Sequence, residues 1–93
     1  MVIGVLEVDL SIEHARSLKD KRMALRSLKD RIRRSFNVSV AEVEDNDVWT
    51  RAVVGIAIVA NDQQFANQVL SKIVDYVEND REVVLDDYRM NFA

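Results

Sequence analysis

The amino-acid sequence predicts one α+β domain in which a four-stranded antiparallel sheet carries two helices on one face. Four segments have strand-like patterns, with clear alternation in residues 2–12, and apolar residues recur at helical spacing over two longer segments. Along the chain these segments follow the order βαββαβ, which is the split-βαβ or ferredoxin-like arrangement. The 93 residues include no proline, and both glycines lie inside apolar runs, so no linker interrupts the chain. We therefore expect a single ferredoxin-like domain over residues 1–93.

The first strand and the first helix are the most regular segments. Residues 2–12 alternate well, with Val2, Leu6, Val8, Leu10 and Ile12 on one side, which predicts a strand with one buried face. Residues 17–36 are expected to form a helix in which Ser17 is the N-cap and Asp20 returns a bond in the manner of a capping box. One apolar stripe on this helix should pack on the sheet; it contains Leu18, Leu25, Leu28, Ile32 and Phe36.

The remaining segments complete the order. Residues 37–44 are strand-like, although Val38 and Val40 point to one face and Ala41 and Val43 to the other, so the inward face stays undecided. Residues 51–60 are apolar on both faces, as a central strand would be. A second helix is expected at about 62–79 and a last strand at 82–92.

The sheet face opposite the helices would be open and partly apolar. We expect it to display five residues of the first and third strands as a candidate interface for self-association: Ile3, Val5, Val53, Ala57 and Val59. The alternative is ordinary cover by loops and long side chains, since apolar atoms are common on any protein surface.

Charge is distributed very unevenly along the chain. The net charge is only −3. Residues 16–34 nevertheless hold nine of the 13 Lys and Arg residues with two acids, a net charge of +7, whereas the remainder has four bases and 14 acids, or −10. Such a dipolar domain can steer an anionic partner onto one face.

Helical spacing collects five of these bases on one flank of the apolar stripe, and this basic ridge consists of Lys19, Arg22, Arg26, Lys29 and Arg33. Because like charges at these spacings repel, the ridge costs helix stability, which favours an anion-binding role with nucleic-acid phosphates as the first candidate. The alternative is a solvated face that serves solubility. Lys21 falls within the stripe, where we expect its long side chain to lie across the sheet edge and snorkel to solvent.

No reaction chemistry is visible in the sequence. There is no cysteine, no glycine-rich phosphate loop, no metal-ligand spacing and no nucleophile–base set, so we expect neither catalysis nor a cofactor or metal. His14 is read as a solvated loop residue, and Trp49 as a core lid that becomes a candidate contact if it is exposed. No signal peptide or membrane span is apparent, which predicts a cytoplasmic protein.

Two motifs carry a family resemblance. SLKDKR at residues 17–22 and RIRRSFNVSVAE at residues 31–42, followed by DVW at residues 47–49, resemble the YlxP-like proteins, short bacterial proteins of unassigned function. The resemblance implies a ferredoxin-like fold. Genes of that family are often found near those for a translation initiation factor and a ribosome-binding factor, which implies a role in ribosome maturation or translation.

The functional expectation joins the basic ridge to this resemblance. The preferred hypothesis is a small RNA- or ribosome-associated binding protein, with ribosomal RNA or a ribosomal subunit as partner, that contacts phosphates through the ridge. The alternative is a homo-oligomeric structural or adaptor protein that uses its open sheet face and its basic helix to bind protein partners.

Overall fold

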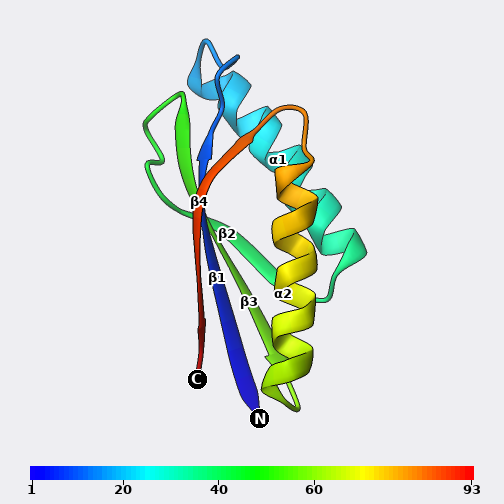
Figure 1. Cartoon of the computed structure of the whole chain (residues 1–93). Coiled ribbons are helices and arrows are strands. Elements are labelled where there is room, and N and C mark those ends of the chain that lie inside the picture. The colour runs from blue at the N-terminus through cyan, green and yellow to red at the C-terminus, as the bar shows by residue number, and fades with distance from the viewer.

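A computed structural model describes all residues, 1–93, and has the expected βαββαβ order (Figure 1). Its elements are β1 (Val2–Ser11), α1 (Leu18–Ser35), β2 (Ser39–Glu44), β3 (Arg51–Ala60), α2 (Gln63–Glu78) and β4 (Val84–Phe92). Each differs from its predicted range by two residues or fewer at either end. Neither helix is long and apolar enough to cross a membrane.

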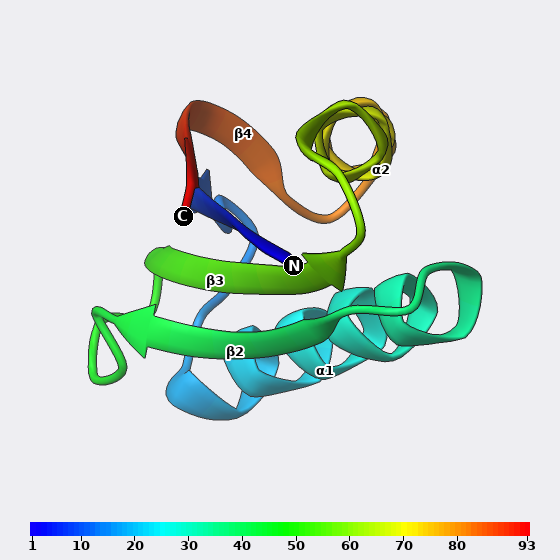
Figure 2. The same cartoon turned by 90° about the horizontal axis from the view of Figure 1, so that it is seen from below.

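The four strands form one antiparallel sheet in the order β2-β3-β1-β4, which confirms the ferredoxin-like class. Both helices lie on one side of it: α1 runs under β2, and α2 packs on β1, β4 and β3 (Figure 2). The inward side chains of β1, buried between sheet and helices, are Leu6, Val8 and Leu10. The sheet therefore has one covered face and one open face, with β2 and β4 as its edges.

The face of β2, undecided from the sequence, is settled by its pairing with β3. Val40 is buried in the core and Val38 packs against it. Ala41 and Val43 are exposed, and Val43 lies over Gly55 on the open face. The register of β2 shifts between Glu42 and Glu44, so this short edge strand ends in a bulge before the turn into β3.

Capping at the start of α1 agrees with the sequence in part. The Ser17 hydroxyl accepts a hydrogen bond from the backbone N–H of Asp20 at 3.1 Å, as an N-cap should. The Asp20 carboxylate does not return to Ser17; instead it accepts from the backbone N–H of Arg16 at 3.0 Å. The expected capping box is therefore shifted by one residue, and Asp20 fixes the approach to the helix.

Gly4 allows α2 and β4 to approach the sheet closely. A Cβ atom at this position would lie 3.0 Å from Ile58 Cγ2, 3.0 Å from Leu70 Cδ1 and 3.3 Å from a Phe92 ring carbon. These atoms belong to three different elements of a packed core, so they have little freedom to retreat.

Gly4→Ala is therefore expected to lower the free energy of unfolding by about 1–3 kcal/mol, as overpacking of a core does. Urea denaturation followed by circular dichroism measures the change. Gly55→Ala is the matched control, because its Cβ would meet the Val43 side chain at 3.1 Å on the open face, where Val43 is half exposed and can turn aside. Equal losses in the two variants would contradict the packing argument.

Candidate nucleic-acid interface

The basic ridge borders a groove between α1 and the edge strand β2. Four of its five residues line a shallow groove of about 360 Å³ together with Leu25, Asp30 and Glu42; the four are Arg22, Arg26, Lys29 and Arg33. Lys19, one turn nearer the helix N-terminus, is exposed and lies outside the groove lining. The structure thus gathers most of the predicted ridge at one place.

The four groove bases differ in the contacts that their side chains already make within the chain. Arg33 donates to the carbonyl oxygen of Val40 at 2.7 Å and lies 3.4 Å from a carboxylate oxygen of Asp30. Arg22, Arg26 and Lys29 take part in no hydrogen bond or ion pair within the chain. Arg33 is therefore in part a tether between α1 and β2, and the other three are the bases free to meet an anion.

Acidic groups also reach this groove. Asp30 lies beside Arg33 and lines the groove. Glu42 enters from β2, with a side chain that is mostly buried. Two carboxylates, of Asp30 and Glu42, therefore share the groove with its bases.

The negative charge of Glu42 is compensated by a buried lysine, Lys21. The ammonium nitrogen of Lys21 lies 2.8 Å from Glu42 Oε2, and only 1% of the side-chain surface of Lys21 is exposed. Glu42 Oε2 is buried and accepts no hydrogen bond of good geometry, so its contact with Lys21 is mainly electrostatic. The expectation that Lys21 snorkels to solvent is wrong: its stem lies in the apolar stripe as predicted, but its charge ends inside the protein.

Lys21 also holds the turn between β2 and β3. Its ammonium group donates to the carbonyl oxygen of Val48 at 2.6 Å and to that of Asp45. Asp45 has a φ of 62°, the left-handed conformation common for Asp in tight turns. The lysine therefore satisfies carbonyl groups that the turn directs inward, and it joins the first turn of α1 to the far end of the hairpin.

This turn carries Trp49 to the surface. The indole side chain is 51% exposed, so it does not serve as a core lid. Its neighbours include the exposed acids Glu44, Asp45 and Asp47, whose charges oppose a polyanion. Trp49 satisfies the exposure condition for a contact, but its acidic surroundings make it a weaker candidate for nucleic acid than the groove bases.

A different set of contacts neutralises Arg31, on the α2 side of α1. Arg31 lies 2.8 Å from Asp80, donates to the Tyr76 hydroxyl at 3.3 Å and stacks over the Tyr76 ring. Partial burial opposes the charge, but the hydrogen bonds to Asp80 and Tyr76 prevail and raise the pKa of Arg31 above its ordinary value. Arg31 is thus paired within the chain, in contrast to Arg22, Arg26 and Lys29 in the groove beside β2.

His14 lines a surface hollow of about 550 Å³ at the start of α1. Asp20, Arg81 and Glu82 also border this hollow, and its floor contains Ile12 and Ala15. Asp20 is engaged by the backbone at Arg16, and no hydrogen bond involves His14. Ser27 also lines the hollow, and its hydroxyl accepts from Arg31 rather than contacting His14.

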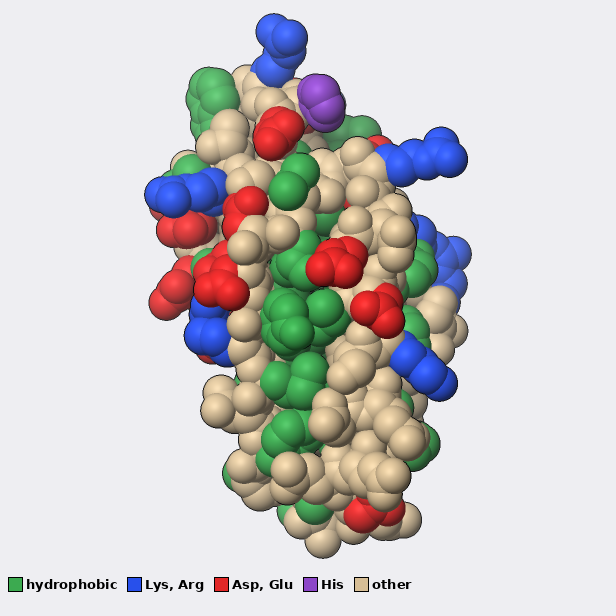
Figure 3. Space-filling model, in the orientation of Figure 1, with side chains coloured by type: hydrophobic (Ala, Val, Ile, Leu, Met, Phe, Trp, Pro, Cys, Tyr) green, Lys and Arg blue, Asp and Glu red, His purple; other side chains and the backbone are tan.

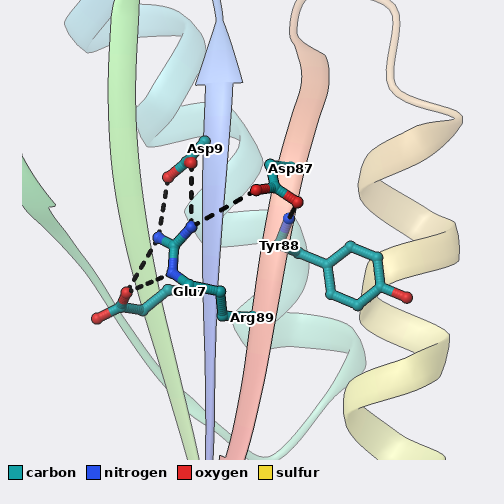
Figure 4. Close-up of polar contacts among 5 residues, drawn as sticks. All are labelled: Glu7, Asp9, Asp87, Tyr88 and Arg89. Carbon is teal, nitrogen blue, oxygen red and sulfur yellow. Dashed lines mark hydrogen bonds and ion pairs between the residues drawn. The ribbon is translucent and has the colours of Figure 1, made fainter.

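The open sheet face has an apolar and a charged half. Of the five predicted interface residues, Ile3, Val5 and Val59 are exposed and Ala57 is half-buried, whereas Val53 is only 8% exposed. In the charged half, Arg89 of β4 bridges Glu7 and Asp9 of β1 with N–O distances of 3.0 Å, and Asp87 lies at 4.0 Å (Figure 4). The guanidinium group of Arg89 thus lies within ion-pair distance of three carboxylates on two strands.

The Arg89 cluster sets the titration of Asp9. The hydrogen bond from Arg89, opposed by slight desolvation and aided by its charge, holds the pKa of Asp9 below its ordinary value of 3.8. The pairing therefore contributes stability above the unfolded pKa and loses it as the pH falls through the folded value, in the range below about pH 4. The contribution is small because the groups are solvated.

Arg89→Gln should return the pKa of Asp9 to about its ordinary value, since the hydrogen bond and the positive charge are both removed. Carbon-detected NMR titration of the Asp9 carboxylate measures the shift. Arg81→Gln serves as the control with the same charge change, because Arg81 makes no ion pair with Asp9, and it should leave the titration in place. If the pKa of Asp9 were the same in Arg89→Gln as in the wild type, the contact drawn in Figure 4 would be contradicted.

Comparison with known proteins places this chain in a family. A family model described as "Protein of unknown function (DUF503)" matches residues 3–90. The "Uncharacterized protein YlxP" of Bacillus subtilis (strain 168) is 32% identical over 82 residues, which cover 88% of this chain and 89% of that protein. The chain therefore belongs to the DUF503 family of YlxP-like proteins.

Proposed function

We propose that the chain is a small RNA- or ribosome-associated binding protein that contacts phosphates through the groove between α1 and β2. The observation that carries the proposal is the set of three bases, Arg22, Arg26 and Lys29, which line one groove without any partner in the chain. Arg31 and Lys21, by contrast, are neutralised by acids of the chain. Unpaired bases that share one groove are suited to bind an anion from outside the chain.

The shape of the groove favours a backbone-reading mode. It is shallow and mainly polar, and Leu25 is its one apolar lining residue. The aromatics that stack bases on sheets of this topology are missing from the open face, where β1 and β3 offer Val5, Glu7, Gly55 and Ala57. Phosphate contacts give affinity with little sequence preference, so we expect recognition of folded ribosomal RNA by shape rather than by base identity.

The direct test is binding of the purified protein to ribosomal subunits and to ribosomal RNA over a series of salt concentrations. Three or four phosphate contacts predict a slope of about −2 to −3 in log affinity against log salt. Cosedimentation with subunits, repeated after nuclease treatment, measures it. Binding that persists after nuclease treatment and is insensitive to salt would refute the proposal.

A second candidate function is a homo-oligomeric or adaptor protein that binds protein partners. A shallow hollow of about 300 Å³ on the open face favours it, with mainly apolar walls that include Val5, Val43 and Ala57. In this alternative the ridge meets an acidic protein surface. It predicts a homodimer that persists at high salt, and protein partners that are retained after nuclease treatment without RNA.

A further inference from the structure

The outer edge of β4 has unpaired backbone groups in a regular pattern. Ile3 and Ala93 exchange both N–H···O bonds at 2.9 Å, and the β1–β4 register continues in single steps from this pair. Bonded and non-bonded pairs alternate along an antiparallel ladder. The N–H and C=O groups of Tyr88, Met90 and Phe92 therefore point away from β1, toward a side where the sheet has no further strand.

A side-chain contact supports this assignment independently. The backbone N–H of Tyr88 donates to the carboxylate of its own neighbour, Asp87, at 2.8 Å (Figure 4). An N–H engaged in the ladder would not be free for such a local bond. Asp87 thus occupies one of the outward donors, which is a common way for an edge strand to discourage indiscriminate pairing.

The same three residues form an apolar row beside this edge. Their side chains lie on the helix side of the sheet, with Tyr88 47% exposed and Met90 and Phe92 partly buried against the core. Apolar side chains gather in a column along the space between β4 and α2 (Figure 3). An unpaired strand edge with an apolar row beside it is the surface that a further strand would cover.

We propose that β4 pairs antiparallel with β4 of a second copy of this chain, about a two-fold axis at Met90. In this register Met90 faces Met90 of the second copy, and Tyr88 faces Phe92 of the second copy at either end. Each outward residue then exchanges both of its backbone hydrogen bonds, and Asp87 releases the Tyr88 N–H. The product is a continuous eight-stranded sheet.

The edge suits a copy of itself in composition and charge. The row is symmetric about Met90, with an aromatic residue at each end, so the two-fold pairing places Tyr88 against Phe92, a favourable cross-strand pair. On the open face Arg89 meets Asn91 of the second copy, and its charge is already balanced by Glu7 and Asp9. No unpaired charge is buried.

The pairing leaves the basic grooves free. Because β2 lies at the opposite edge of the sheet, the two grooves stand at the far ends of the dimer. Seven strand spacings separate the outer strands by about 34 Å. This inference does not rest on the proposed function, since either RNA or a protein partner could occupy the grooves.

Single-cysteine crosslinking tests both the pairing and its register, because the chain contains no cysteine. Met90→Cys should form a disulfide dimer on mild oxidation, since residues facing each other at the axis have Cα atoms about 5.5 Å apart, within disulfide range. Tyr88→Cys should not, because its two copies lie about 14 Å apart, four residues along the strand. Val59→Cys reports on pairing through the open sheet face.

Sedimentation of the unmodified protein over a concentration series completes the test and is independent of any effect of substitution on folding. A reversible dimer, with crosslinking confined to Met90→Cys, supports the proposal. Crosslinking confined to Tyr88→Cys would overturn the register, and crosslinking confined to Val59→Cys would overturn the use of β4. A monomer throughout the series would overturn the dimer itself.

Discussion

Lys21→Met is expected to lower the free energy of unfolding by about 3 kcal/mol, a large part of the stability of a domain of this size. Methionine can keep the packing of the lysine stem but removes the ammonium group. The Glu42 carboxylate then remains mostly buried without the counter-charge that lies 2.8 Å from it in the wild type. The inward carbonyl groups of Asp45 and Val48 lose their donor as well.

A double-mutant cycle separates the free energy of the Lys21–Glu42 ion pair from that of the bonds between Lys21 and the turn. Glu42→Gln in the Lys21→Met background removes the orphaned charge, so the double variant should be more stable than the sum of the single losses predicts, by about 1–3 kcal/mol. Arg22→Met, one residue along the same helix and exposed, is the matched control and should change stability by less than about 0.5 kcal/mol. Urea denaturation of the wild type, the two single variants, the double variant and Arg22→Met measures these differences.

The single tryptophan of the chain reports on the turn directly. Trp49 follows Val48, whose carbonyl oxygen accepts from Lys21, so release of the turn should change the emission of the indole and its quenching by acrylamide. Full stability of Lys21→Met, with unchanged Trp49 emission, would mean that the buried ammonium group is dispensable.

The sequence predicted the elements because each rule that it obeys is local. Period-two alternation in residues 2–12 and helical spacing in residues 17–36 depend on neighbours within one element, and both agree with the structure to within two residues. The order of the elements then predicts an antiparallel sheet with both helices in one layer on one face. The ridge positions follow in the same way, because α1 is regular from its N-cap Ser17 onward.

What the sequence did not predict involves contacts between elements. Lys21 ends at carbonyl groups of a turn about 25 residues away, and that meeting requires the bulge in β2 and the left-handed Asp45. Glu42 joins the groove only because β2 turns that position toward α1, which the undecided register concealed. Two signals of a buried pair were present in the sequence. Lys21 lies inside an apolar stripe, and Glu42 alternates with core residues.

Reversal of two groove charges is expected to have the largest effect on function. Arg22→Glu combined with Lys29→Glu should weaken binding to ribosomal RNA about 100-fold or more, because two charge-assisted contacts are lost and repulsion replaces them. The salt slope should also fall by about two, one for each phosphate contact removed. Fluorescence anisotropy of labelled RNA at several salt concentrations measures both quantities.

The control must carry the same change in net charge outside the groove. Arg16→Glu with Arg34→Glu meets this condition, because both residues are exposed, make no ion pair and do not line the groove. General attraction between the +7 segment and a polyanion would weaken both double variants equally. Binding through the groove requires that the first double variant lose far more affinity than the second, while circular dichroism shows both to be folded. Arg33 is left unchanged in this test because its bond to the Val40 carbonyl joins α1 to β2, and its loss would confuse binding with folding.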